Sequence, residues 1–275
     1  MTSAKPLPLL GAALPLDGLR LHRDWIFERQ RDLELQDFFW AEVLNGDWRS
    51  VADAIRTELD GYRGRLGVHG PFWGFNLASQ DPDIRAVVQK RMMQGLDVCE
   101  AVGATQMVIH SPYTTWDYNN LDYNPGSRAK IAERMHDALG ATVRRAEAMG
   151  LVLVIENIED KDPHERVALA RSFDSPAVRV SIDTGHANYA HCSSGAPPVD
   201  YYAVAAGDML HHVHLQDSDG YADRHWNPGE GNIQWPQLFR ALGSITSNPR
   251  LILEVRNKEG LRAGADHLIG LGLAE

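Results

Sequence analysis

The sequence predicts an α/β protein, a single (β/α)8 barrel (TIM barrel) over residues 1–275, and three observations support this. Eight short strand-like segments alternate strictly with eight helical segments, the order that produces a parallel sheet with right-handed crossovers. A length of 275 residues is typical of a closed eight-stranded barrel. No linker or low-complexity segment divides the chain. A doubly wound open sheet is the alternative that the alternation leaves open.

The strand segments are recognised by apolar or alternating side chains and by the turn residues that end them. LVLVIE is apolar up to its final glutamate, which is typical of a strand buried on both faces. RLGVH and QMVIH each end at a histidine and are followed by Gly-Pro or Ser-Pro, which are turn signals. The predicted strands are residues 9–14, 32–37, 65–69, 106–110, 151–156, 178–183, 210–215 and 251–255.

The helical segments carry apolar residues at helical spacing, and some have start and stop signals. The segment 81–102 begins with Asp81 and Pro82, a capping residue and a first-turn proline, and ends before Gly103. The segment 127–149 ends before Gly150 in the same way. The predicted helices are residues 19–29, 48–62, 81–102, 127–149, 163–172, 199–207, 235–242 and 259–271.

Composition excludes several classes of protein. The formal net charge of -10 argues against general electrostatic binding to nucleic acid or to an anionic membrane. Cys99 and Cys192 are the only cysteines, so we expect no disulfide framework and a cytoplasmic location. The N-terminal apolar run is short and broken by prolines, so we interpret it as a first strand and not as a signal peptide. No run approaches membrane-spanning length.

The segment 210–235, LHHVHLQDSDGYADRHWNPGEGNIQW, concentrates imidazole and carboxylate groups. His212 and His214 fall on one face of its strand, and Asp223 and His225 follow in a Gly-rich loop. Such a concentration of polar groups is unfavourable unless they bind a ligand, which is usually a cation. Neutral nitrogen and anionic oxygen ligands suit Zn²⁺ or Mn²⁺. A solvated loop with one hydrogen-bonded histidine is the alternative interpretation.

Other predicted strands also end in candidate ligands. The carboxyl ends of barrel strands surround one mouth, so these side chains should meet there. Glu156 and Glu254 interrupt apolar strands, where a buried carboxylate without compensating charge would be strongly penalised. A single histidine could be a hydrogen-bonded core residue, but coincidence over six consecutive strands favours a metal. The candidates are His69, His110, Glu156, Asp183, His186, His214 and Glu254.

The motifs around these residues are GVHGPF, VIHSPY, VIEN, SIDTGH, HVHLQDSDG, DRH, GEGNIQW and LILEV. Over nearly the whole chain they resemble the xylose-isomerase-like barrel superfamily, which includes sugar isomerases and epimerases and the endonuclease IV group. The epimerase resemblance implies one divalent metal and two glutamates that also handle protons. Its metal ligands would be Glu156, Asp183, His214 and Glu254. The endonuclease IV resemblance implies three zinc ions held by these four with His69, His110, His186, Asp223 and His225.

The segments expected at the rim favour the isomerase branch. A nuclease acting on duplex DNA needs lysines and arginines around its mouth, and residues 69–77, 110–126 and 183–198 contain neither. Trp73 and Trp116 in these segments suit a cleft in which sugars stack, although aromatic rings also stack on bases.

Substrate contacts are predicted less directly. The substrate-binding arginine that epimerases carry shortly after the strand-seven histidine is not matched in place. Gly220 stands there, and Arg224 is the nearest substitute. The predicted substrate contacts are His69, Trp73, His110, Trp116 and Arg224.

We therefore predict a divalent-metal-dependent isomerase or epimerase of a small sugar or keto-sugar that acts through a metal-stabilised enediolate. Glu156 and Glu254 are the expected proton-transfer residues, and His186 is expected to hydrogen-bond a substrate oxygen. Mn²⁺ or Zn²⁺ is the expected metal, with Mg²⁺ or Co²⁺ as alternatives. Nucleic acid and membrane are not expected as partners, and a homo-oligomer is left open.

Three other functions are compatible with the same residues. An endonuclease IV-like trinuclear-zinc phosphodiesterase would cut DNA at abasic sites. A dehydratase or lyase would use the same enediolate to expel a β-hydroxyl group. A metal-containing sugar-binding protein would bind without turnover.

Overall fold

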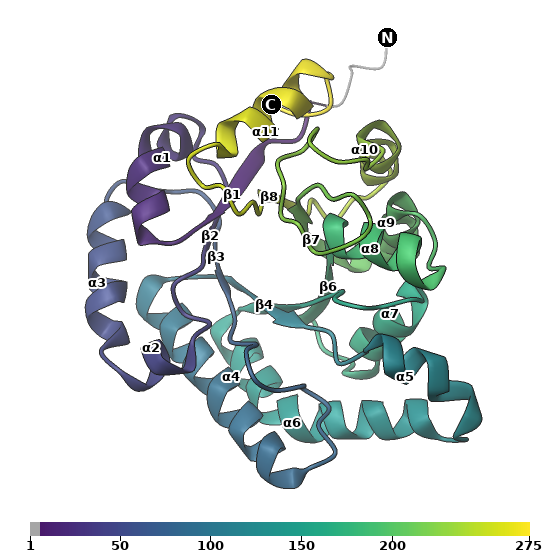
Figure 1. The fold of residues 1–275 in the computed structure, drawn as a ribbon. Coiled ribbons are helices and arrows are strands. Elements are labelled where there is room, and N and C mark those ends of the chain that lie inside the picture. The colour runs from purple at the N-terminus through teal and green to yellow at the C-terminus, as the bar shows by residue number, and fades with distance from the viewer. Residues whose placement is uncertain (1–5) are drawn as a thin grey trace.

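The computed structural model describes residues 6–275, which form a closed barrel of parallel strands surrounded by helices (Figure 1). Strands pair in chain order from β1 to β8, and β8 pairs with β1 to close the ring. The strands are β1 (Leu10–Leu14), β2 (Leu33–Leu35), β3 (Leu66–His69), β4 (Gln106–His110), β5 (Val152–Glu156), β6 (Val178–Asp183), β7 (Leu210–Leu215) and β8 (Arg250–Leu253).

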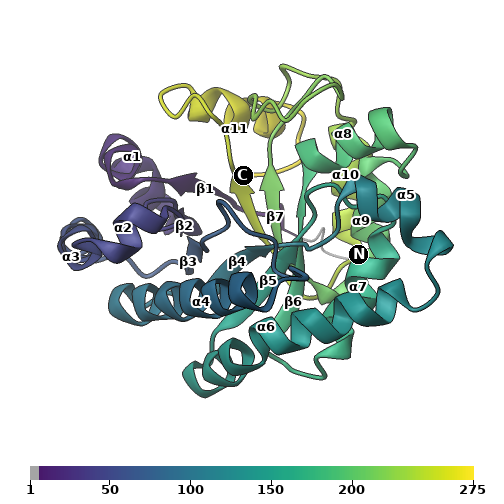
Figure 2. The same cartoon turned by 60° about the horizontal axis from the view of Figure 1, so that its bottom comes forward.

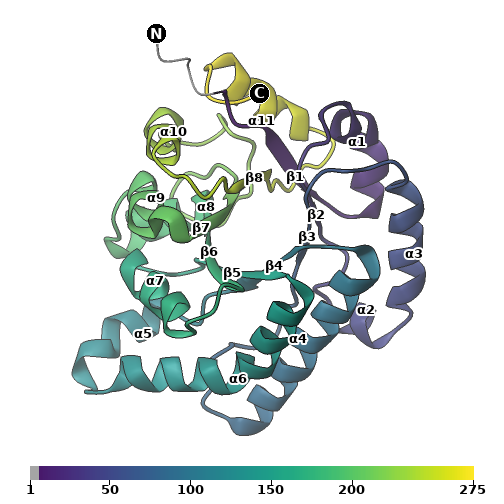
Figure 3. The same cartoon turned by 180° about the vertical axis from the view of Figure 1, so that it is seen from behind.

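The helices form an outer layer around the strands, which Figure 3 shows from the opposite side. In Figure 2 the two long helices α4 and α6 run side by side, packed against each other. The α-helices are α1 (Leu16–Arg29), α2 (Ala41–Asn45), α3 (Trp48–Glu58), α4 (Pro82–Val102), α5 (Thr115–Asn120), α6 (Ser127–Met149), α7 (Pro163–Ser172), α8 (Thr184–Ser194), α9 (Val199–Ala206), α10 (Trp235–Gly243) and α11 (Leu261–Gly270). Two short 3₁₀ helices are η1 (Leu121–Tyr123) and η2 (Gly207–Met209).

The predicted closed barrel is confirmed, and the open-sheet alternative is excluded. The predicted helix signals are confirmed as well. The Asp81 side chain accepts a hydrogen bond from the Asp83 backbone at 2.8 Å, at the start of α4. Gly103 and Gly150 follow α4 and α6 in the left-handed region, with φ of 75° and 66°. Glycine adopts this conformation without steric cost, so it ends a helix efficiently.

Two strands differ from the prediction by more than one residue at an end. The second strand was predicted over 32–37, and β2 is shorter. The last strand was predicted over 251–255, and β8 ends before Glu254. The reason lies in the next residues, because the Arg256 backbone N–H donates to the His225 carbonyl at 2.8 Å, which turns the chain toward the loop after β7.

Three helices were not predicted: α2, α5 and α8. All three are short or rich in small polar residues, so they lack the apolar spacing on which the prediction relied. Two of them begin at a local side-chain cap: the Asp183 side chain accepts from the His186 backbone at 2.7 Å and begins α8. Thr114 caps α5 by accepting from the Asp117 backbone at 3.1 Å.

The described part of the N-terminal segment contains the first strand, β1. Residues 1–5, which belong to the segment interpreted as not being a signal peptide, lie outside the described residues. Among residues 6–275, no helix combines the length and the apolar character needed to cross a membrane. The thiols of Cys99 and Cys192 are both free, as the composition predicted.

Candidate active site

Four side chains predicted as metal ligands meet at the carboxyl end of the barrel. Glu156 ends β5, Asp183 ends β6, His214 lies in β7, and Glu254 follows β8. One ligand atom from each lies within 4.8 Å of the ligand atoms of the others, and all four residues are buried. The closed barrel brings them together because consecutive strand ends surround one mouth.

His214 lies between carboxylates from three other parts of the barrel. Its Nδ1 is 2.8 Å from Glu156 Oε1 and 3.1 Å from Glu254 Oε2, and its Nε2 is 3.0 Å from Glu34 Oε1. Burial would lower the pKa of His214, but these carboxylates outweigh burial and hold the pKa well above its ordinary value. The imidazolium therefore supplies positive charge among the carboxylates.

The unsatisfied groups of this site fit a divalent cation. Glu156 Oε2 is buried and has no hydrogen-bond partner among the described residues, which is costly for a carboxylate. Burial would raise the pKa of Glu156, yet the neighbouring His214 outweighs burial and lowers it. Two glutamates, an aspartate and an imidazole form a donor set that Zn²⁺ and Mn²⁺ accept. With Nδ1 on a cation, His214 would keep its Nε2–H bond to Glu34, as metal-bound histidines commonly do.

A second group of candidate ligands consists of His69, His110 and Glu156. The Nε2 atoms of both histidines lie 3.8 Å from Glu156 Oε2, the oxygen without a partner. Burial lowers the pKa of His110 to about 3, against the opposing effect of Glu156. Its imidazole is therefore neutral near pH 7, the form that binds a metal.

A third group consists of His186, Asp223 and His225. Asp223 Oδ1 lies 3.4 Å from His186 Nε2 and 3.1 Å from His225 Nε2. Burial would lower the pKa of His225, but the hydrogen bond to Asp223 and the nearby carboxylates raise it to about 9. The structure thus brings all nine predicted ligands into three adjoining groups, and their occupation by metal stays a prediction.

A cavity of about 410 Å³ opens over the three groups. Its walls include the predicted residues His69, His110, Glu156, His186 and Glu254. This volume lies in the range of small-molecule sites.

Aromatic rings form one wall of the cavity. Trp73, predicted as a substrate contact, is half-exposed and stacks on Trp40 with ring centroids 5.4 Å apart and planes 11° apart. Phe72 stacks on His110 at 4.2 Å. Flat, exposed rings of this kind suit the apolar face of a sugar.

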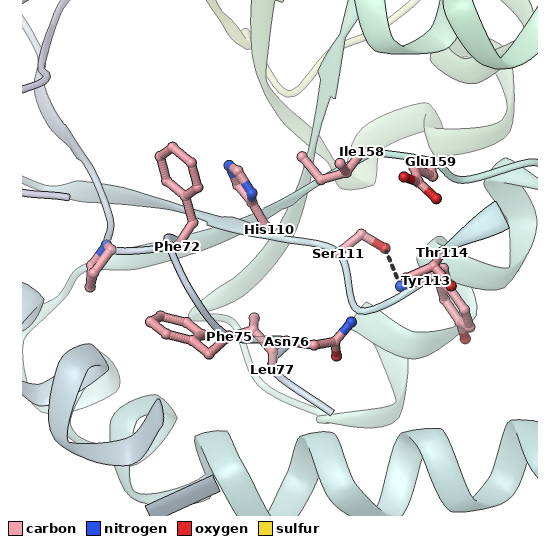
Figure 4. Close-up of a pocket in the computed structure, with 11 residues that line it drawn as sticks. Phe72, Phe75, Asn76, Leu77, His110, Ser111, Tyr113, Thr114, Ile158 and Glu159 are labelled. Atoms are coloured by element: carbon pink, nitrogen blue, oxygen red, sulfur yellow. Dashed lines mark hydrogen bonds between the residues drawn. The ribbon is translucent and has the colours of Figure 1, made fainter. Parts of the chain in front are cut away.

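A smaller cavity of about 150 Å³ adjoins the same wall on the side of α5 (Figure 4). It shares Phe72 and His110 with the larger cavity. In Figure 4, Ser111 accepts a hydrogen bond from the Tyr113 backbone at 3.3 Å on the loop after β4. The two cavities thus meet at His110.

Trp116 and Arg224 do not line either cavity. Trp116 lies on α5, is 76% exposed, and borders a separate surface hollow with Arg134. Arg224 is held by Asp219, with Nη2 2.8 Å from Oδ2 and Nε 3.1 Å from the same oxygen. The structure therefore does not bring these two side chains to the site. The position of a residue in a rim loop does not determine the direction of its side chain or its bonding partner.

Glu34 is one of the site residues that were not predicted. Glu34 on β2 is buried, and its Oε2 lies 3.0 Å from His212 Nε2 while its Oε1 contacts His214. Burial would raise the pKa of Glu34, but the two histidines outweigh burial and lower it well below its ordinary value. The available signal was a carboxylate between Leu33 and Leu35 on a strand, the same signal that identified Glu156.

Gln216 organises the third group, and it too was not predicted. Its Nε2 donates to Asp183 Oδ1 at 3.1 Å and to Asp223 Oδ1 at 3.0 Å. Its Oε1 accepts from the His225 backbone at 2.9 Å. This amide joins the end of β7 to the loop that carries two of the ligands.

Comparison with known proteins identifies the family to which this architecture belongs. Residues 34–271 match the family described as the xylose isomerase-like TIM barrel. D-psicose 3-epimerase from Ruminiclostridium cellulolyticum is 28% identical over 213 residues, which are 72% of this chain and 65% of that protein.

Solved structures agree. The TTHB071 protein from Thermus thermophilus, solved after soaking with ZnCl2, has a TM-score of 0.72 and 27% identity, over 95% of this chain and 97% of that one. A D-tagatose 3-epimerase-like protein has a TM-score of 0.76, covering 95% of this chain and 96% of that one, and at 19% identity it shows a likeness of fold alone. Since the family match spans most of its residues, the chain belongs to the xylose isomerase-like TIM barrel family.

Proposed function

We propose that this chain is a divalent-metal-dependent isomerase or epimerase of a small sugar or keto-sugar. The observation that carries the proposal is that Glu156 and Glu254 approach one atom, His214 Nδ1, from strands β5 and β8 and both line one cavity. Two carboxylates in this arrangement can contact opposite faces of a substrate carbon between them. The D-psicose 3-epimerase relative supports the same reaction class.

Proton transfer next to a substrate carbonyl is the step that these residues support. Glu156 Oε2 is buried without a hydrogen-bond partner among the described residues, so this carboxylate oxygen is available to accept a proton from the substrate. Glu254 Oε1 accepts a 2.6 Å hydrogen bond from Gln36 Nε2, which orients its carboxylate for proton return on the other face. A divalent cation held by Glu156, Asp183, His214 and Glu254 would supply the Lewis acid that makes the adjacent C–H acidic.

His186 would bind a substrate oxygen in this proposal. Its Nδ1 lies 2.9 Å from the Asn157 carbonyl, which fixes the ring and turns Nε2 toward the cavity and Asp223. Burial would lower the pKa of His186, but Asp183 and Asp223 outweigh burial and hold it well above its ordinary value. The ring therefore remains a hydrogen-bond donor at neutral pH.

Exchange with solvent tests this function. Incubation with Mn²⁺ or Zn²⁺, D₂O and a panel of ketoses and keto-acids should introduce deuterium next to the carbonyl of at least one compound. Glu156→Gln should slow this exchange roughly 10²–10⁴-fold, the usual contribution of a general base. Mass spectrometry or NMR measures the deuterium, and Glu42→Gln on the exposed side of α2 is a control with the same chemical change.

An isomerase could show no deuterium exchange, because a hydride-shift isomerase transfers its hydrogen without exchange with solvent. A direct assay for aldose and ketose products resolves this case. Absence of both exchange and product over the panel would remove the proposal, and binding without either would indicate a sugar-binding protein. Loss of a β-hydroxyl group in the product would indicate the dehydratase or lyase instead.

A second candidate is a trinuclear-zinc phosphodiesterase. The observation that favours it is the presence of all nine ligands in three adjoining groups. A DNA duplex with one abasic site should remain uncut at physiological salt, because the acidic chain offers little charge to neutralise phosphates. Efficient incision, with no exchange in any sugar, would establish this candidate in place of the isomerase.

A further inference from the structure

The loop after β8 has a backbone held on both sides of Arg256. The Arg256 N–H donates to the His225 carbonyl at 2.8 Å, and the Glu254 N–H donates to the Leu215 carbonyl at 3.1 Å. Further along, the Lys258 carbonyl accepts a 2.6 Å hydrogen bond from His22 Nε2. These bonds hold the loop at the edge of the candidate active site, so side chains on it are presented from a defined backbone.

Lys258 contributes one cation to the cavity wall. Its ammonium donates to the Ala13 carbonyl at 2.9 Å and to Gln36 Oε1 at 2.7 Å. An ammonium group has three N–H donors, so one is left without a partner among residues 6–275. The same Gln36 donates to Glu254, which connects this lysine to the candidate proton-transfer residue.

Arg256 contributes the second cation, and its guanidinium has no partner among residues 6–275. The side chain is exposed and lines the cavity, and within the described part of the chain it has no hydrogen bond, ion pair or ring contact. By contrast, the Arg224 guanidinium donates a hydrogen bond to Asp219. The Arg256 guanidinium is therefore available to bind a ligand in the cavity. Its paired N–H donors match the two oxygens of a phosphate or a carboxylate.

The charges of the cavity indicate what such a cation would bind. Each carboxylate that lines the same space already lies beside an imidazole, as Glu156 and Glu254 do with His214. Arg256, by contrast, has no counter-charge among residues 6–275. A neutral sugar gives no reason for an unpaired arginine and a partly free lysine on one side. One arginine and one lysine suit a single anionic group, not the repeated phosphates of a nucleic acid.

We propose that Arg256 and Lys258 form a subsite for one anionic group, a phosphate or a carboxylate, carried by the sugar substrate. The anionic group would lie on the β8 side of the cavity, with the reacting carbons between Glu156 and Glu254. This inference rests on the proposed function and names its substrate class: a phosphorylated or carboxylated sugar.

Calorimetric titration of the metal-loaded protein tests the subsite. The probes are a neutral ketose (D-fructose), its 1-phosphate and 6-phosphate, and a hexuronate (D-galacturonate). At least one charged sugar should bind roughly tenfold or more tighter than D-fructose, the scale of one charge-assisted hydrogen bond. Arg256→Met should reduce this ratio toward one, and Lys258→Met should reduce it in part. Arg240→Met on the exposed side of α10 removes the same charge elsewhere and should leave the ratio unchanged.

The outcomes separate the subsite from the reaction. Equal binding of neutral and charged sugars, no binding of any charged sugar, or a preference that survives Arg256→Met each overturns the subsite. A preference lost in Arg256→Met, in a protein that exchanges no deuterium and isomerises no sugar, supports the subsite and removes the proposed reaction. The relative affinities of the phosphates and the hexuronate identify which anion is recognised.

Discussion

At the centre of the barrel mouth, His214 contacts Glu156 and Glu254 through Nδ1 and Glu34 through Nε2. Glu34 also lies 3.0 Å from His212, so one buried carboxylate holds two neighbouring imidazoles. A carboxylate behind a metal-bound histidine fixes its ring and tautomer and increases its basicity. At the scale of single residues, Glu34 is therefore expected to position His214 without touching substrate.

Glu34→Gln should weaken Mn²⁺ or Zn²⁺ binding roughly 10–100-fold, the usual effect of losing an outer partner of a metal ligand. Glu254→Gln, which removes a predicted ligand, should weaken binding further and abolish turnover while the protein stays folded. Competition with a chromophoric chelator measures affinity, and circular dichroism checks folding. Unchanged affinity in Glu254→Gln would contradict the assignment of the central site.

Metal affinity should also depend on pH through His214. Its pKa is held well above the ordinary value by the carboxylates around it, although burial opposes them. A metal must displace the Nδ1 proton, so affinity should rise with pH through the neutral range, by up to about tenfold per unit for one released proton. Chelator competition between pH 6 and pH 8 measures the slope. A flat profile would show that His214 binds no metal or is already neutral.

At the scale of elements, a buried ion pair joins α7 to the loop after β5. Arg166 on α7 is fully buried, and its Nε lies 3.8 Å from Asp160 Oδ1. Its three nitrogens make no hydrogen bond within the described residues. Asp160 also accepts from Ser111 Oγ at 2.9 Å, and thereby ties together the loops after β4 and β5, both of which border the site.

Arg166→Met should destabilise the protein by about 3–5 kcal/mol, because it leaves Asp160 buried without its counter-charge. Burial already raises the pKa of Asp160 to about 6, with Arg166 opposing it. A carboxyl with a raised pKa is unfavourable while ionised, so the loss should be smaller at pH 5 than at pH 7, where the carboxylate must stay charged. Denaturant unfolding at the two pH values measures the difference.

The double variant Asp160→Asn with Arg166→Met is the matched control for this pair. It removes both charges, so it should be more stable at pH 7 than Arg166→Met alone. Equal stability of the single and double variants would mean that charge burial is not the cause. Loss of stability in Arg166→Met that is independent of pH would lead to the same conclusion.

At the scale of the whole molecule, metal binding should stabilise the fold. The four predicted ligands of the central site come from β5, β6, β7 and the residue after β8, so they are assembled only when the barrel closes. A metal at roughly 1,000 times its Kd would add about 4 kcal/mol of stability. Chelation should therefore lower the Tm by several degrees, which differential scanning calorimetry measures. An unchanged Tm would contradict metal binding by the folded barrel.

The number of metals distinguishes the two candidate functions. Protein purified without added metal should contain one metal per chain if it is an isomerase and three zinc ions if it is a phosphodiesterase. His69→Ala should leave the count at one in the first case, because His69 is not one of the four side chains of the central group. It should lose zinc in the second case, because His69 lies with His110 and Glu156 in a second group of candidate ligands. Elemental analysis per chain provides the count.

The sequence by itself determined the barrel and the side chains that meet at the centre of its mouth. Alternation of apolar strands and helices is a local pattern, and each of Glu156, Asp183 and His214 occupies a strand position that the chain on either side specifies. Parallel closure then places strand ends at one mouth without further information. Glu34 could have been predicted in the same way, because it too is a carboxylate on an apolar strand.

Only the tertiary structure decided which loop cation faces the cavity. Arg224 and Arg256 both follow strands that supply ligands, and local sequence does not distinguish them. Asp219 binds the guanidinium of the first, whereas the guanidinium of the second has no partner among residues 6–275. The Arg256 backbone is bonded to His225, a residue from another loop. Side-chain direction in loops is set by such long-range partners, and the pattern of neighbouring residues does not contain them.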